Sequence, residues 1–277
     1  MIEVAELYRV KNWVKSLGIC ILGLSALNFA IASNPYMFLL GLAQTFLLFS
    51  FLYSLDDFND YIVEGEKNFI GDLIKNSRIS KKPAFALCIL PLLLSIYIMV
   101  VNFSTNYFIF YIIFVVFSFL YSMPKVRLGD IPIVDAICNI IFFSCIFLLS
   151  YFFVNTIMTT KAYFFLIWIS IYIFSLEILH QLAHFNKDKI STVKVLGRGK
   201  SLAVLKTSFF VSILIGIFFF IMAPELRVFS IVMSVFGSIR FLYVSKMNEK
   251  THFEKFRNKM GGILEGGIYF ALLAIGV

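Results

Sequence analysis

Four acidic side chains lie in a segment of nine residues, in an otherwise apolar part of the chain. Asp56, Asp57, Asp60 and Glu64 follow the run 36–55, which contains no charged residue. Because a charge in hydrocarbon is costly, an acidic cluster directly after such a run indicates that the chain leaves a membrane there. Carboxylate oxygens suit hard cations such as Mg²⁺, which proteins bind through one or two carboxylates together with substrate phosphates. The sequence therefore predicts a cation site at a membrane surface.

The spacing within this cluster predicts a helix. Asp56, Asp60 and Glu64 are four residues apart, so on a helix they share one face. Like charges at that spacing repel each other. In a chain of net charge +8 we expect basic side chains to hold them in place. The alternative is a solvated helix end without a site.

A second polar stripe begins with Glu177. It continues with Gln181, His184 and Asp188, which lie four, seven and eleven residues further on and therefore share one helical face. His180 stands beside them, four residues before His184, which is also a spacing found in zinc sites. No third imidazole or thiolate accompanies the two histidines, so a zinc site is the weaker reading.

The two clusters are related in position. Each ends an apolar run and is followed by a basic loop, which suggests a weak duplication of the first four spans by the next four. Two carboxylate clusters that face each other across a helical bundle would hold Mg²⁺ ions bridging a diphosphate. Basic side chains would take up the remaining phosphate charge. The candidates are Lys67, Arg78, Lys125 and Arg127.

Composition places these clusters in a membrane protein. Of 277 residues, 60% are hydrophobic and 14% charged, against about 45–50% and about 25% in soluble domains. The four cysteines lie in apolar runs, which indicates buried packing residues. A helix needs about 20 apolar residues to cross a bilayer, and strand alternation is absent, so we expect one all-α domain over 1–277. The nine candidate spans are 14–33, 36–55, 83–102, 105–122, 131–153, 162–182, 202–222, 227–245 and 260–277.

The loops predict the orientation. Of 24 Lys and Arg residues, only Lys161 and Arg227 fall in the loops on one side; the other 22 fall on the side of the acidic clusters. The positive-inside rule puts that side and the N-terminus in the cytoplasm. A transporter should show polar residues near the midplane and on both sides, and this chain shows few. The loop 64–83 has an amphipathic pattern, which fits either an interfacial helix acting as a lid or a simple connector.

Several segments together resemble the UbiA-type intramembrane prenyltransferases. Residues 56–64 are similar to the family's NDxxDxxxD motif and 121–128 to its YSxPPxRLK segment. Residues 181–188, with Thr192 and Leu196–Gly197, resemble its QxxDxxxD motif with the threonine and LG that follow, and 9–13 its RPxxW-type entry. The order of the segments and the nine spans also match the family.

This resemblance implies a fold of nine transmembrane helices around a central cavity that opens to the cytosol. It implies an integral membrane prenyltransferase, whose partners are an isoprenyl diphosphate, a lipophilic or aromatic acceptor and the bilayer, with no nucleic acid. Mg²⁺ would assist ionisation of the diphosphate, aromatic faces such as Tyr53 and Tyr121 would shield the carbocation, and the acceptor would capture it. The implied Mg²⁺ ligands are Asp56, Asp60, Glu64 and Asp188. The expected catalytic residues are Asp56, Asp60, Asp188, His184 and Arg127. The expected substrate-binding residues are Asp57, Asn59, Lys67, Asn68, Arg78, Tyr121, Lys125, Arg127, Gln181 and His184.

The chain departs from the family pattern at several positions. Asp56 replaces the usual Asn, Glu64 the last Asp, and His184 an Asp; the RPI-type segment is represented only loosely by 78–80. Imidazole binds Mg²⁺ less well than carboxylate does, so His184 is a metal or water contact or, as a weaker alternative, the base that deprotonates the acceptor. Rival functions are an intramembrane terpene cyclase, a sugar-phosphate transferase acting on polyprenyl phosphate, and a transporter or scaffold without catalysis.

Overall fold

Helices make up almost all of the described part of the chain in the computed structural model. Every regular element there is an α-helix or a short 3-10 helix. The structure describes residues 2–10, 14–25, 35–65, 67–186, 191–248 and 253. The all-helical fold expected from the apolar windows is confirmed for these residues.

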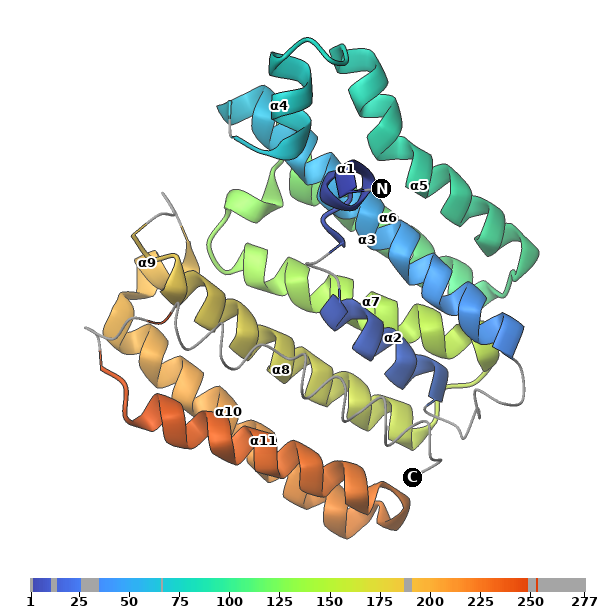
Figure 1. The fold of residues 1–277 in the computed structure, drawn as a ribbon. Helices are drawn as coiled ribbons and strands as arrows, with labels where there is room; N and C mark the ends of the chain where they lie inside the picture. The colour runs from blue at the N-terminus through green and yellow to red at the C-terminus, as the bar shows by residue number, and fades with distance from the viewer. Residues whose placement is uncertain are drawn as a thin grey trace. The chain divides into compact units, whose positions relative to one another are not determined.

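The chain divides into two compact units. The first unit comprises residues 1–128 and 145–157, and the second unit comprises residues 129–144 and 158–277. The first contains α1 (Ile2–Leu7), α2 (Val14–Ser25), α3 (Pro35–Glu64), α4 (Phe69–Lys75), α5 (Lys81–Val101), α6 (Thr105–Ser122) and the later part of α7 (Val134–Val154). The second unit contains the beginning of α7, α8 (Thr160–Ala183), α9 (Thr192–Leu196), α10 (Arg198–Met222) and α11 (Arg227–Ser245) (Figure 1). The 3-10 turn η2 (Leu128–Asp130) lies at the boundary in the sequence, and η3 (Pro224–Leu226) joins α10 to α11.

Seven of the described helices are long and apolar enough to cross a membrane: α3, α5, α6, α7, α8, α10 and α11. They match the second to eighth of the windows expected from the sequence. The helix α2 covers the beginning of the first window, whose last eight residues, 26–33, lie outside the described residues, as does the ninth window, 260–277. The count of nine spans and the central cavity remain predictions.

The longest helix of the first unit, α3, carries the acidic cluster. Pro35 opens it at the first helical position, where the missing N–H costs nothing. The helix continues without interruption past the apolar run to Glu64. Gly65 then adopts φ 65°, a left-handed conformation that glycine provides readily and that commonly ends helices. The acids therefore stand on a rigid helix rather than in a loop.

Three neighbours of the same unit fix α3 in place. The Cys88 thiol of α5 donates to the Ser54 carbonyl at 3.2 Å, and Phe114 of α6 packs edge-on against Phe49 at 5.9 Å between ring centroids. Gly41 lets Leu24 of α2 approach closely, since a Cβ there would lie 3.0 Å from the leucine methyl groups. Small residues permit such close helix packing in membranes, where association depends on contact between side chains.

The second unit is built around α8, α10 and α11. Its core includes Ile178 and Leu182 of α8 with Leu205 and Phe209 of α10, all buried. The hairpin of α10 and α11 is close-packed, because a Cβ on Gly216 would lie only 2.3 Å from the Ser234 hydroxyl. This packing supports the end of α8, where the second polar stripe lies.

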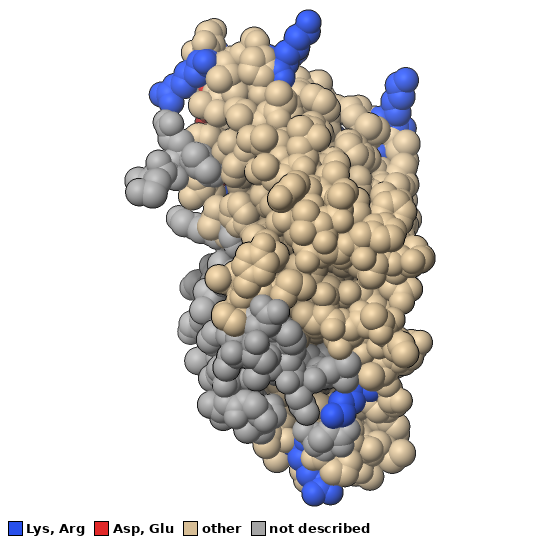
Figure 2. Space-filling view, turned by 90° about the vertical axis from the view of Figure 1, so that its right-hand side faces the viewer, with Lys and Arg blue, Asp and Glu red and all other residues tan. Residues whose placement is uncertain are grey.

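The outward faces of the long helices are apolar, as expected of membrane spans. On α5 the large side chains Leu93, Leu94, Tyr97 and Val100 are exposed. Figure 2 shows a face of mostly uncharged side chains, on which lysine and arginine side chains protrude at only a few places. The four cysteines are buried, as the sequence predicted.

Candidate active site

The acids at the end of α3 form a cluster whose exposure varies from residue to residue. Because α3 is helical through Glu64, Asp56, Asp60 and Glu64 share one face, as their spacing predicted. Asp57 and Asp60 are buried, Asp56 is half-buried, and Glu64 is exposed. Buried carboxylates require paired charges or hydrogen bonds, so their partners define what this end of the helix can bind.

Asp57 is held by an arginine from the N-terminal segment. The Arg9 guanidinium forms a fork with the Asp57 carboxylate, with Nε donating to Oδ2 at 2.9 Å and Nη2 donating to Oδ1. Burial alone would lower the pKa of Arg9, but the charge and hydrogen bonds of Asp57 raise it above its ordinary value. Asn68 braces the same turn, since its Nδ2 donates to the Asp57 carbonyl at 2.7 Å while its Oδ1 caps α4.

A second arginine joins two further acids. Arg127 donates from Nη2 to Asp60 Oδ1 and from Nη1 to Glu64 Oε1, the latter at 2.8 Å. Next to this pair, the Ser122 hydroxyl donates to Asp56 Oδ1 at 3.1 Å. The basic side chains expected to hold the acids in place are therefore Arg127 and Arg9.

Both arginines have unusual backbone conformations. Arg9 adopts φ 45° and Arg127 φ 39°, in the left-handed region that residues other than glycine rarely occupy. Such strain persists only where the surrounding contacts hold it, and it concentrates at functional sites. Here it brings each guanidinium to a carboxylate of α3.

The loop after α3 forms a short helix, α4, that packs against the N-terminal segment. Ile70 is fully buried in a cluster with Leu7, Tyr8, Ala84 and Cys88. The amphipathic pattern of the sequence therefore does correspond to a helix, although its proposed role as a lid stays a prediction. The other expected substrate-binding residues nearby are Lys67, Arg78 and Lys125, which are exposed, Tyr121, which is half-buried, and Asn59, which is buried.

In the second unit, buried Gln181 joins three elements. Its Nε2 donates to Asp135 Oδ2 of α7 at 2.8 Å and to Glu177 Oε1 of α8 at 3.1 Å. Its Oε1 accepts from the Val193 N–H of α9 at 3.2 Å. Asn139 also donates to Asp135, at 3.2 Å. Gln181 therefore holds two carboxylates beside each other at the end of α8.

The start of α7 is strained beside this network. Ile133 adopts φ 71°, which is a clear outlier for a β-branched residue, and its N–H donates to Thr192 Oγ1 at 2.7 Å. Asp135 follows two residues later in the first turn of α7. The threonine of the second motif thus fixes the backbone from which Asp135 projects.

The histidines occupy the C-terminal end of α8. His184 caps the helix by donating its N–H to the His180 carbonyl at 3.1 Å, and the two rings lie 4.7 Å apart between centroids. Asp188, expected to be a metal ligand and catalytic residue, lies outside the described residues. Within the described ranges, no three His, Cys, Asp or Glu side chains are grouped so as to hold a metal ion, either at the histidine pair or at the end of α3.

Comparison with known proteins identifies the family. The model of the UbiA prenyltransferase family matches residues 16–261. The chain belongs to the UbiA prenyltransferase family. The prediction of a membrane enzyme that transfers prenyl groups is confirmed by this match.

Solved structures share the UbiA fold over almost their whole length. A UbiA homologue from Archaeoglobus fulgidus matches with a TM-score of 0.81 at 18% identity, covering 99% of this chain and 97% of the homologue. The same protein bound to GPP and Mg²⁺ matches with a TM-score of 0.78, at the same identity and coverage. A digeranylgeranylglyceryl phosphate synthase matches with a TM-score of 0.66 at 15% identity, covering 99% of this chain and 95% of the synthase. No curated protein matches the chain.

The donor set of the first unit of this UbiA protein fits Mg²⁺. It offers oxygen ligands only, and Mg²⁺ needs one or two protein carboxylates because waters and substrate phosphates complete its shell. Three of the four acids pair with the two arginines, and the fourth, Asp56, accepts a hydrogen bond from the Ser122 hydroxyl, so the described cluster holds more acids than arginines. The local chemistry is therefore suited to the metal that the family match implies.

Sequence reasoning did not assign several residues that make these contacts. Arg9 and Ser122 stood inside the quoted motifs but were given no role, and Asp135 and Asn139 were not included in the site. Asp135 was visible as an ionisable residue near the end of a span, which is a signal of function in itself. Asn139 follows Asp135 by four residues, and this spacing within an expected helix is the signal that could have indicated their contact.

Proposed function

We propose that this UbiA-family chain transfers an isoprenyl group from an isoprenyl diphosphate to a lipophilic acceptor. The observation that carries the proposal is the cluster of carboxylates and arginines on α3, within a chain of matching family and fold. The A. fulgidus homologue of this fold has been solved with GPP and Mg²⁺ and with DMAPP and Mg²⁺. These ligands support an allylic diphosphate as the donor and Mg²⁺ as the cofactor.

We propose Asp56, Asp60 and Glu64 as metal ligands, together with Asp188, which follows the last residue of α8 by five positions in the sequence and lies outside the described residues. When bound, Mg²⁺ would neutralise the charge that develops on the leaving diphosphate. Asp57 is given a supporting role rather than a ligand role, because the Arg9 fork already engages both of its oxygens.

Arg127 has a central part in this proposal. Its guanidinium bridges Asp60 and Glu64 and is suited to bind phosphate oxygens in the same two-pronged way. We propose that it exchanges carboxylate partners for the diphosphate when the donor arrives. The exposed side chains Lys67, Arg78 and Lys125 would take up further phosphate charge.

The reaction then breaks the allylic C–O bond, and the electron pair leaves with the diphosphate. The aromatic faces of Tyr53 and Tyr121 would stabilise the carbocation. The acceptor forms the new bond and loses a proton. His184 is a candidate to hold water or metal beside Gln181, and as the weaker alternative to receive that proton. We place the active-site loops and the N-terminus in the cytoplasm because the basic residues concentrate there.

The experiment measures diphosphate release in purified protein with Mg²⁺, using geranyl and geranylgeranyl diphosphate as donors. Asp60→Ala and Asp188→Ala should each abolish release, and chelation of Mg²⁺ should abolish it reversibly. Asp72→Asn is the matched control, because Asp72 is an exposed acid on α4 and should tolerate the change. Full activity in both alanine variants would reject the site.

A companion variant tests His184. His184→Asp should preserve diphosphate release if the side chain contacts metal or water, and should abolish product formation if the imidazole is the base. Mass spectrometry of products formed from labelled donor, with and without added phenolic acceptors, identifies the acceptor class. Products formed without any acceptor would instead indicate a cyclase.

A further inference from the structure

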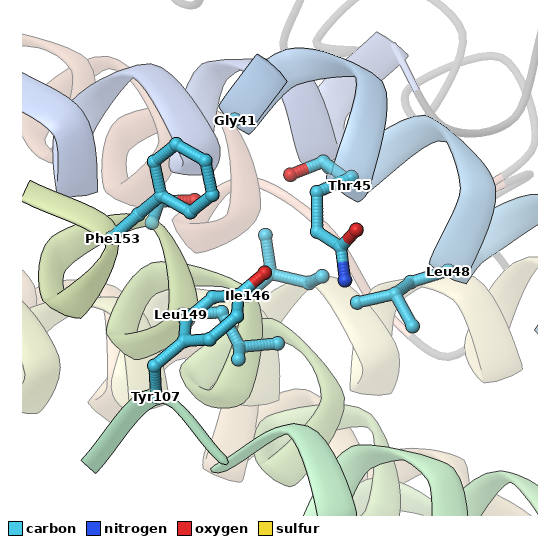
Figure 3. A pocket seen from close by; sticks show the side chains of 9 residues that line it. Gly41, Thr45, Leu48, Tyr107, Ile146, Leu149 and Phe153 are labelled. Atoms are coloured by element: carbon cyan, nitrogen blue, oxygen red, sulfur yellow. The ribbon is translucent and has the colours of Figure 1, made fainter. Parts of the chain in front are cut away.

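A small pocket lies between three membrane helices of the first unit, away from the acidic cluster. Figure 3 shows side chains from α3, α6 and α7 around it, with the Tyr107 ring directed into it. The lining atoms lie so close together that no gap between them takes a water molecule. The lining residues are Gly41, Gln44, Thr45, Leu48, Tyr107, Ile146, Leu149, Ser150 and Phe153.

Two polar side chains of this pocket have no hydrogen-bond partner in the described part of the protein. Gln44 is 3% exposed, and neither its amide nitrogen nor its oxygen is paired. Tyr107 is 0% exposed, and its hydroxyl is unpaired. Their neighbours Thr45 and Ser150 differ, since both hydrogen-bond to the Cys20 thiol. Buried polar groups are nearly always paired, so these two require an explanation.

The chemistry of the pair specifies a ligand. The amide of Gln44 offers two donors and an acceptor, and the phenol of Tyr107 offers one of each. No charged residue lines the pocket, so a charged group would be costly there. The lining residues lie in helices suited to cross a membrane. The fitting ligand is therefore lipophilic and carries a neutral hydroxyl or carbonyl group.

The pocket is distinct from the proposed diphosphate site. The faces of α3 and α6 meet at Asp56 and Ser122 and again at Phe49 and Phe114, so the two helices run alongside each other. Gln44 precedes Asp56 by twelve residues, which is about 18 Å along the helix at the usual rise. A group bound at Gln44 would thus lie three turns away from the carboxylates.

We propose that Gln44 and Tyr107 bind the hydroxyl or carbonyl group of a neutral lipophilic molecule inside the membrane. Because the gaps are narrow, the Gln44 side chain turns aside to admit the ligand and then bonds to it. This site is independent of the proposed function and does not require a diphosphate. The closely packed Gly41 and the ring of Phe153 form its apolar walls.

The test compares 4-propylphenol with propylbenzene, which lacks only the hydroxyl. Thermal unfolding of the purified full chain in detergent is followed as each compound is titrated. The phenol should raise the unfolding temperature of the unmodified protein. Propylbenzene at the same concentrations should leave that temperature unchanged. Gln44→Leu and Tyr107→Phe should each weaken the apparent affinity for the phenol by about fivefold to tenfold, as expected for one hydrogen bond between neutral groups.

Tyr111→Phe is the matched control. Tyr111 is a buried tyrosine one turn further along α6, but its hydroxyl is paired with Ser95 Oγ at 2.6 Å. The response to propylphenol should survive this change. Without ligand, Tyr107→Phe should unfold at or above the temperature of the unmodified protein, because it removes an unpaired hydroxyl, whereas Tyr111→Phe should unfold lower.

Two results would overturn the proposal. The first is an equal response to propylphenol and propylbenzene. The second is a loss of stability in Tyr107→Phe as large as that in Tyr111→Phe, because the Tyr107 hydroxyl would then be satisfied by water or by Gln44. Gln44→Leu places an apolar side chain in apolar surroundings, but if it fails to fold, Tyr107→Phe decides the question alone.

Discussion

The two acids that share Arg127 should contribute very differently to stability. Asp60 is 13% exposed and its partner Arg127 14%, so this pair is largely removed from water. Breaking a buried pair costs about 3–5 kcal/mol. Since both side chains keep some contact with solvent and Arg127 retains Glu64, we expect about 2 kcal/mol for Asp60→Asn. Glu64 is 37% exposed, and an exposed pair contributes only about 0.2–1 kcal/mol.

The assay is thermal unfolding of the two amide variants in the same detergent. At about 2–4 °C per kcal/mol for a chain of roughly this size, Asp60→Asn should lower the unfolding temperature by about 4–8 °C and Glu64→Gln by at most about 4 °C. Asp72→Asn serves as the control for loss of an exposed acid, where only a small effect on α4 is expected. If Glu64→Gln is as damaging as Asp60→Asn, burial does not set the strength of these pairs, and the reasoning fails.

Two further predictions concern the other polar partners. Arg9→Met should lower the unfolding temperature by at least as much as Asp60→Asn, because it leaves the Asp57 carboxylate buried without the arginine that pairs with it. Arg9→Lys should recover only part of that loss in unfolding temperature, because an ammonium group cannot form the two-pronged pair. Unchanged stability in Arg9→Met would contradict the structure. Gln181→Glu replaces two donors with a third acid beside Asp135 and Glu177, so its unfolding temperature should fall steeply from pH 5 to pH 8 as the carboxylates ionise and repel. Gln181→Leu should show no such slope, and equal pH profiles of the two variants would refute this account.

Features encoded by neighbouring residues were predictable from the sequence. Seven of the apolar windows coincide with helices of the described residues that are long and apolar enough to cross a membrane. The spacing of Asp56, Asp60 and Glu64 placed them on one face of a helix that does extend through them. The short helix α4 also followed from its amphipathic pattern. Each of these depends on the periodicity of a single segment, which the sequence shows directly.

Features that depend on packing between segments were not predictable. Arg9 and Asp57 are 48 residues apart, and Gln181 and Asp135 are 46 apart. Hydrophobic periodicity gives the faces of helices but not which helices meet or at what register. For the same reason nothing in the sequence singled out Gln44 or Tyr107, each of which lies in a mostly apolar stretch.

The N-terminal segment also has a consequence for biosynthesis. Arg9 finds its partner 48 residues later, and the Tyr8 hydroxyl bonds to the Leu87 carbonyl 79 residues later. At about 5–20 residues per second, the ribosome reaches Asp57 about 2–10 s after it has made Arg9, and Leu87 about 4–16 s after it has made Tyr8. Tyr8 and Arg9 are therefore synthesised well before the residues that anchor them. During that interval the Arg9 guanidinium has no carboxylate of α3 to bind, and its positive charge favours the cytoplasmic orientation that we propose for this segment.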